Sequence, residues 1–215
     1  MRFSRKKLYK AFELVFFFIV IPVIIGMVRE RSFMVGLLWG GAVVASLWMW
    51  LVSPAYRKEA LNLRGLLAGW RDFWPLFLLV GAALCVAMYV LLPQHLFAFP
   101  LERPYTWLMV MLLYPLLSAL PQEIIYRSFF FHRYADLLSH KQLMIWASAI
   151  LFGGMHAMFG NWVAVVMSTI GGWLFSRSYA KYRSLPLVVM EHALYGCLIF
   201  TLGLGIYFYS GYVWN

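Results

Sequence analysis

The sequence predicts an all-α protein, a polytopic bundle of about seven transmembrane helices with short interfacial helices. Hydrophobic residues make up 64% of the 215-residue chain and charged residues only 12%, against about 45–50% and about 25% in ordinary soluble domains. Apolar runs long enough to cross a bilayer recur along the chain. Basic residues gather in short segments between these runs. A soluble enzyme and a disordered tail are excluded, because a soluble domain of this size could not bury so much apolar surface.

Each apolar run is a predicted span. The first follows basic residues, as in a signal peptide, but its apolar run is too long and no small-residue cleavage site follows, so we expect it to be retained. Segment 53–73 is expected to be a loop that carries a short amphipathic interfacial helix. The predicted spans and this loop together form a single integral membrane domain, residues 1–215. The predicted spans are residues 10–28, 33–52, 74–92, 105–123, 143–159, 161–176 and 187–209.

The net charge of +10 has a membrane explanation. Alternation of basic and nearly neutral loops is the positive-inside pattern, which predicts a cytoplasmic N-terminus. We therefore expect membrane lipids as partners and no nucleic acid, and a location in a bacterial inner (cytoplasmic) membrane. The basic groups lie within residues 2–10, 57–71, 127–141 and 177–183, and the nearly neutral loops are 29–31 and 93–104.

Ionisable residues inside the spans are candidates for function, because burying them in lipid is costly. Glu123 and Arg127 are four residues apart and share a helix face, which by itself predicts an ion pair that anchors a helix end. His156 follows two glycines that allow another helix to approach closely. His192 lies in the last span, next to Glu191. A single buried histidine is commonly a hydrogen-bonded core residue, but an acid and two histidines on three spans indicate a site.

The chemistry of this trio is that of hydrolysis. A buried carboxylate can take and return a proton, and a histidine can position water or donate to a developing oxyanion. His and Glu side chains could instead hold a zinc ion with an open fourth position. The sequence has no HExxH or other close-spaced metal motif. We expect no cofactor, and a zinc-dependent peptidase remains the alternative.

Three short motifs, in this order, carry a resemblance to a known family. They are QEIIYR at residues 122–127, Phe152 to His156, and His192 to Gly196. The chain resembles the CPBP family (CAAX protease and bacteriocin-processing, or Abi) of intramembrane proteases, whose pattern is EExxxR, FxxxH and HxxxN on three helices. The resemblance covers about residues 105–205 as a protease core, whereas residues 1–104 match only as spans and an interfacial segment.

The resemblance implies an intramembrane endopeptidase of the glutamic rather than the metallo type. Its substrate would be a membrane-associated peptide or protein. By this analogy Glu123 acts as the general base, while His156 and His192 position water or stabilise the oxyanion. Arg127 holds Glu123 or the helix end.

Two residues depart from the family pattern. Gln122 replaces the family's first glutamate and cannot act as a base. Gly196 replaces the asparagine and offers no side-chain donor. Either Glu123 takes the role of base and Gln122 supplies an amide donor, or the protein is a non-proteolytic relative. We expect activity, because Glu123, Arg127, His156 and His192 are all present.

Two other function classes stay open. A membrane scaffold would bind a partner's transmembrane segment without hydrolysis. A small transporter or channel would use the His and Glu residues as a proton relay, although the chain shows no inverted repeat of interrupted helices.

Straight spans do not bring the three groups together. A rise of about 1.5 Å per residue places Glu123 and His192 near the same membrane face but His156 too deep for contact. We therefore expect the fifth span to tilt or to begin deeper in the membrane, or residues 128–142 to form a re-entrant segment.

Overall fold

The computed structural model describes residues 5–28 and 31–208, and all regular structure within them is helical, which confirms the predicted fold class. Short π-helical and 3₁₀ segments join several of the α-helices. The α-helices are α1 (Arg5–Val15), α2 (Ile21–Val28), α3 (Arg31–Val52), α4 (Pro54–Ala60), α5 (Leu63–Leu91), α6 (Ala98–Glu102), α7 (Pro104–Tyr114), α8 (Leu120–Glu123), α9 (Phe130–Arg133), α10 (Lys141–Met155), α11 (Trp162–Tyr182) and α12 (Leu185–Thr201).

Within the described residues, five continuous helices are long and apolar enough to cross a membrane. The two other predicted spans, 161–176 and 187–209, are also helical, as α11 and α12, but α12 has only 17 residues. The chain is thus a polytopic helical membrane protein. The five helices are Arg5–Met27, Met34–Val52, Leu63–Leu91, Pro104–Arg133 and Lys141–Phe159.

The predicted start of the third span at residue 74 is wrong. Helix α5 begins at Leu63, because the Asn62 side chain accepts a hydrogen bond of 2.8 Å from the backbone N–H of Gly65 and caps the helix. Pro75 lies inside α5 without ending it. Of the predicted loop 53–73, only α4 remains as the short separate helix.

The predicted end of the fourth span at residue 123 is also wrong. The helix continues to Arg133 through a π-helical segment, Ile124–Phe129, because Arg127 is buried inside the bundle rather than placed in a loop. The helix ends at Arg133, residues 134–140 form a turn and α10 begins at Lys141, so the predicted re-entrant segment, 128–142, is not formed. Glu123 therefore lies about 15 Å from the helix end, deeper than predicted.

The last span is shorter than predicted. Helix α12 ends at Thr201, and Gly203 follows with φ of 94°, a conformation that favours glycine and stops the helix. The predicted end of this span, residue 209, lies outside the described residues.

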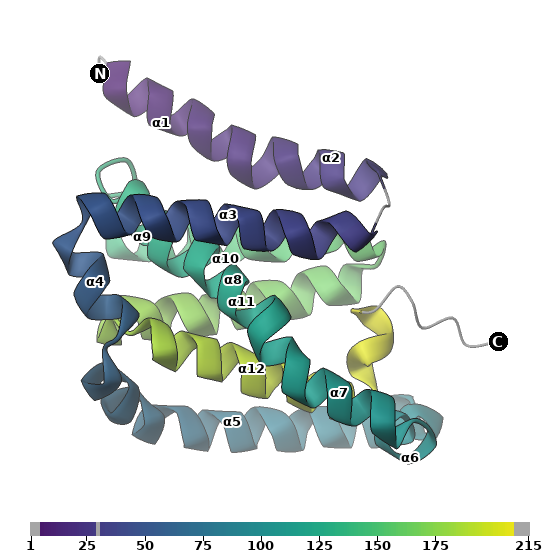
Figure 1. Cartoon of the computed structure of the whole chain (residues 1–215). Helices are drawn as coiled ribbons and strands as arrows, with labels where there is room; N and C mark the ends of the chain where they lie inside the picture. The colour runs from purple at the N-terminus through teal and green to yellow at the C-terminus, as the bar shows by residue number, and fades with distance from the viewer. Residues whose placement is uncertain (1–4, 29–30, 209–215) are drawn as a thin grey trace.

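The long helix formed by α7, α8 and α9 organises the bundle. In Figure 1 it runs obliquely across the molecule, with α3 on one side and α5 on the other. Helix α12 packs against α5, α7 and α8, while α10 and α11 pack against each other. Helices α1 and α2 lie outermost, beyond α3 (Figure 1). Side chains from α8, α10 and α12 can therefore meet inside the bundle.

Aromatic packing joins the first helix to the rest. The ring of Phe18 lies edge-on to Tyr126, Phe130 and Tyr134, with centroids 5.2, 5.3 and 6.0 Å away. Of the two glycines before His156, only Gly153 makes the predicted close approach. A Cβ there would lie 2.9 Å from the Cα of Thr169 on α11, whereas Gly154 faces open space.

The basic segments meet at one end of the bundle, which we call the basic end. There Lys10 pairs with Asp136 at 2.7 Å, and Arg133 pairs with Glu13 at 2.6 Å. This arrangement is what the positive-inside pattern requires. The assignment of this end to the cytoplasm stays a prediction, and residues 1–4 of the first basic group lie outside the described residues.

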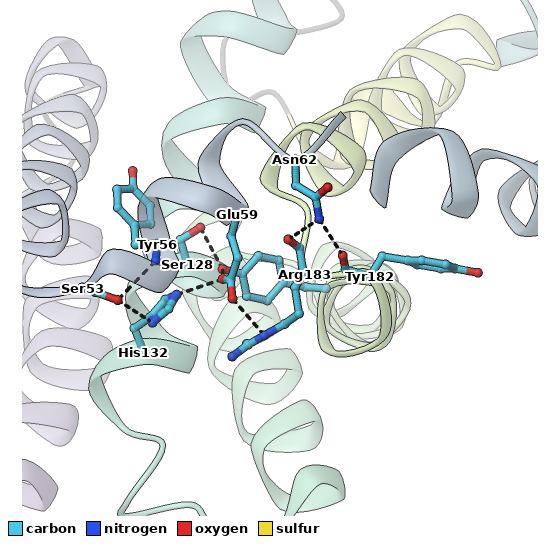
Figure 2. A network of polar contacts seen from close by, with 9 residues as sticks. Ser53, Tyr56, Glu59, Asn62, Ser128, His132, Tyr182 and Arg183 are labelled. Atoms are coloured by element: carbon cyan, nitrogen blue, oxygen red, sulfur yellow. Dashed lines mark hydrogen bonds and ion pairs between the residues drawn. The ribbon is translucent and has the colours of Figure 1, made fainter. Parts of the chain in front are cut away.

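A second group of polar contacts lies at the basic end, and Figure 2 shows it. The Glu59 carboxylate accepts hydrogen bonds from His132 at 2.9 Å and from Tyr179 at 2.7 Å, and it pairs with Arg183 at 3.1 Å. We call these four residues the Glu59 cluster. It ties α4 to α9 and to the end of α11.

Candidate active site

The predicted acid and the late histidine are in direct contact. Glu123 ends α8 and is fully buried. The Nδ1 atom of His192, on α12, lies 2.8 Å from Oε1 of Glu123. Since a carboxylate only accepts, Nδ1 carries the proton, and Nε2 of the neutral ring is left as an acceptor.

Arg127 holds the other side of the carboxylate. Its Nε lies 3.0 Å from Oε2 of Glu123, one helical turn away, and both side chains are fully buried. The guanidinium also donates to the Gly172 carbonyl at 3.3 Å and lies 4.4 Å from the ring centre of Phe152. The predicted ion pair is present, inside the bundle rather than at a helix end.

His156 joins the site through Phe152, the aromatic residue one turn before it. Its Nδ1 donates to the Phe152 carbonyl at 2.8 Å, so Nε2 is again free to accept. The ring of Phe152 lies 4.8 Å from the imidazole of His156 and 5.4 Å from that of His192, between centroids. Among the described residues, no hydrogen bond joins His156 to Glu123 or to His192. The two histidines are therefore neighbours on one aromatic surface.

A cavity of about 1200 Å³ opens beside these groups. It lies between α1–α2, α3 and the core, and its walls are mostly apolar. The side chains of Gln122, His156 and His192 are in its wall, and that of Glu123 is not. Such a cavity, mostly apolar with a few converging polar groups, is the usual form of a ligand site.

Gln122 and Glu123 point in different directions, since successive residues of a helix differ by about 100°. The Gln122 amide nitrogen donates to Ser118 at 2.8 Å, and its Oε1 is buried without a hydrogen-bond partner. An amide therefore faces the cavity directly. The carboxylate reaches it only through His192.

Sequence reasoning missed Tyr114, the last residue of α7. Its ring lies edge-on to His192, with centroids 5.9 Å apart, and it lines the cavity. The only available signal was that Tyr114 precedes Gln122 by about two helical turns. The sequence also missed Gly172 and Phe175, which contact Arg127 from α11.

The described residues contain no group of three His, Cys, Asp or Glu side chains placed to hold a metal ion. Glu191, which adjoins His192 in sequence, turns instead towards Ser178 on α11 and accepts its hydroxyl at 2.9 Å. It is buried and is not part of the cavity wall.

Comparison with known families finds a match over part of the chain. Residues 103–198, slightly less than half of the chain, match the model for type II CAAX prenyl endopeptidase Rce1-like proteins. The segment contains all three motifs, so the predicted resemblance to CAAX-type membrane proteases is confirmed over these residues. No curated protein and no solved structure matches the chain.

Proposed function

We propose that this protein, whose residues 103–198 belong to the CAAX-type membrane proteases, hydrolyses a peptide bond of a membrane-associated protein. The observation that carries the proposal is a histidine on the wall of an apolar cavity with a buried carboxylate behind it. His192 and Glu123 are 2.8 Å apart, and only His192 faces the cavity.

In this mechanism His192 is the general base. A water molecule in the cavity gives a proton to Nε2 of His192 as its oxygen attacks the scissile carbonyl carbon. Glu123, which accepts a hydrogen bond from Nδ1–H of His192, stabilises the imidazolium that forms. The imidazolium then returns the proton to the leaving amine. Glu123 thus acts through His192, rather than as the base that the sequence suggested.

The other predicted residues support this step. Nε2 of His156, on the cavity wall, is an acceptor suited to hold the second proton of the water or an N–H of the substrate. The Gln122 nitrogen donates one of its two N–H groups to Ser118, so in our proposal the other stays available to the substrate. Arg127 holds the Glu123 carboxylate in position through the contact of 3.0 Å.

The test uses the purified full chain in lipid nanodiscs with a library of quenched-fluorescence peptides, each carrying a hydrophobic anchor. Mass spectrometry identifies the cleaved bond. We expect cleavage by the wild type and a fall in kcat of at least about 100-fold for His192→Ala, the scale of general acid–base catalysis. The exposed His140→Ala is the matched control and should cleave at the wild-type rate.

Two outcomes contradict the proposal. One is that no member of the library is cleaved by the wild type. The other is that His192→Ala cleaves as fast as His140→Ala.

One observation favours a second candidate. The group that faces the cavity at the end of α8 is the amide of Gln122 and not a carboxylate, as expected of a non-proteolytic scaffold that binds a transmembrane segment. The same nanodiscs distinguish the two. A scaffold retains an anchored peptide uncleaved, and His192→Ala leaves its affinity unchanged.

A further inference from the structure

Gly196 leaves a space in the cavity wall that another residue fills. It lies one helical turn after His192 on α12, and it lines the cavity. A Cβ built on Gly196 would collide with the ring of Tyr114 and would lie 2.5 Å from its hydroxyl oxygen. The side chain of Tyr114 therefore occupies the space into which a side chain at position 196 would extend.

The position of the Tyr114 ring is well defined. It lies edge-on to His192 and to Phe200, with centroids 5.9 and 5.6 Å away. The residue that follows it, Pro115, begins a π-helical segment, Pro115–Ala119. An aromatic ring has few rotatable bonds, so this packing sets where its hydroxyl lies.

A hydroxyl at this place has a specific chemical use. The wall of the cavity is mostly apolar, so a hydrogen bond made there is stronger than in water. When water adds to a carbonyl, the carbonyl oxygen becomes an oxyanion that needs a donor already in position. His192 and Tyr114 are adjacent, so one carbonyl group can contact both.

We propose that the Tyr114 hydroxyl donates a hydrogen bond to the oxyanion formed during hydrolysis and replaces the donor that Gly196 lacks. This inference rests on the proposed peptidase function. No bond to Tyr114 is formed or broken, because the hydroxyl only donates while His192 moves the proton. Tyr195 is the other tyrosine on this wall, but its hydroxyl is fully buried and its ring is packed between Phe73, Phe77 and Phe175.

The first test removes the hydroxyl and keeps the ring. Tyr114→Phe should lower kcat by about 10²- to 10³-fold, the cost of one oxyanion donor. KM should not change, because the bond forms only in the transition state. The matched control is Tyr105→Phe on the same helix, an 85% exposed tyrosine, which should cleave at the wild-type rate.

The second test moves the donor to α12. Gly196→Asn alone should be inactive, because its Cβ collides with the Tyr114 ring. Tyr114→Ala alone should be at least as slow as Tyr114→Phe, because it also lacks the donor. The double variant gives the asparagine amide the vacated space, and we expect it to cleave at least tenfold faster than either single variant. A purely structural role for Tyr114 predicts no such rescue.

The outcomes separate this inference from the function on which it rests. If the wild type cleaves no peptide, the peptidase proposal itself fails. If the wild type cleaves, His192→Ala does not, and Tyr114→Phe is as fast as Tyr105→Phe, only the role of Tyr114 is overturned. A double variant that is folded by thermal unfolding but no faster than Tyr114→Ala overturns it as well.

Discussion

The protein buries two carboxylates in contrasting ways. Glu59 at the basic end accepts from His132 and Tyr179 and pairs with Arg183 (Figure 2). Glu123 inside the bundle has His192 and Arg127 as partners. Around Glu123, however, buried polar atoms are left without a hydrogen bond, whereas none of the four residues of the Glu59 cluster has such an atom. The unpaired atoms are Oε1 of Gln122, Nη1 of Arg127 and the hydroxyl of Tyr195.

The difference indicates what each carboxylate is for. A buried polar atom without a hydrogen-bond partner lowers the free energy of unfolding by about 1–3 kcal/mol. Several such atoms close together therefore need a reason other than stability. Proteins break their own packing rules mainly at functional sites. In our proposal the Glu59 cluster, whose buried polar atoms all have partners, only joins helices, whereas the surroundings of Glu123 form the reaction site.

The largest expected effect comes from removing the partner of the inner carboxylate. Arg127→Ala leaves Glu123 as an uncompensated buried charge, so we expect the free energy of unfolding to fall by about 3–5 kcal/mol. Cleavage by the remaining folded protein should also be lost, because Glu123 no longer holds His192. Unfolding in mixed micelles, followed by tryptophan fluorescence, measures the first effect, and the peptide assay measures the second.

Arg177→Ala on the exposed face of α11 is the control for Arg127→Ala. It should change the free energy of unfolding much less and leave cleavage intact. Equal losses of stability and of cleavage in the two variants would show that the ion pair of Arg127 with Glu123 contributes no more than an exposed arginine does.

A smaller effect, on stability alone, is expected at the basic end. Glu59→Gln keeps the shape of the side chain but weakens its contacts with His132, Tyr179 and Arg183. We expect the free energy of unfolding to fall by about 1–3 kcal/mol, with kcat per folded molecule unchanged. Glu102→Gln, at an exposed position, is the matched control. A Glu59→Gln variant that is fully stable but slow in cleavage would show that Glu59 serves catalysis and not stability.

The smallest effect is a dependence of stability on pH. Burial raises the pKa of Glu59, but hydrogen bonds from His132 and Tyr179 and the charge of Arg183 outweigh it and hold the pKa below its usual 4.5. The folded state therefore binds the proton less readily than the unfolded state. The stabilisation by Glu59 is complete above pH 4.5 and is lost as the pH falls through the lower folded pKa.

Thermal unfolding of the wild type and of Glu59→Gln at pH 7, 5, 4 and 3 measures this dependence. The difference in stability should be constant from pH 7 to 5 and shrink below that. A difference that grows as the pH falls would mean that the pKa of Glu59 is raised and not lowered.

The comparison also shows how far sequence reasoning reaches. The pairing of Glu123 with Arg127 follows from a spacing of four residues. Each motif spans no more than two helical turns, so the residues that share a helix face can be predicted from their spacing alone. The Glu59 cluster was missed, because Glu59 lies among basic residues in a predicted loop. Its partners His132 and Tyr179 are 73 and 120 residues away in the chain, and such contacts depend on how helices pack.

The position of Glu123 behind the cavity wall could not be predicted from the sequence either. Apolar runs predict where a span lies, but an arginine inside a run predicts its end. Here Arg127 lies within the helix, because Glu123, Gly172 and Phe152 surround it. Its burial lengthens the fourth span to Arg133 and moves Glu123 away from the membrane face.

The π-helical segments on either side of α8, Pro115–Ala119 and Ile124–Phe129, have a consequence for how such a protein can change. A π turn holds one residue more than an α turn, and it is gained or lost by a single-codon insertion or deletion. Loss of the extra residue would turn the π turn into an α turn and leave the following residues in nearly their present orientation relative to α7. Gln122 would then still face the cavity and Glu123 would still lie behind His192, so this helix can change its length by one residue without exchanging the two side chains.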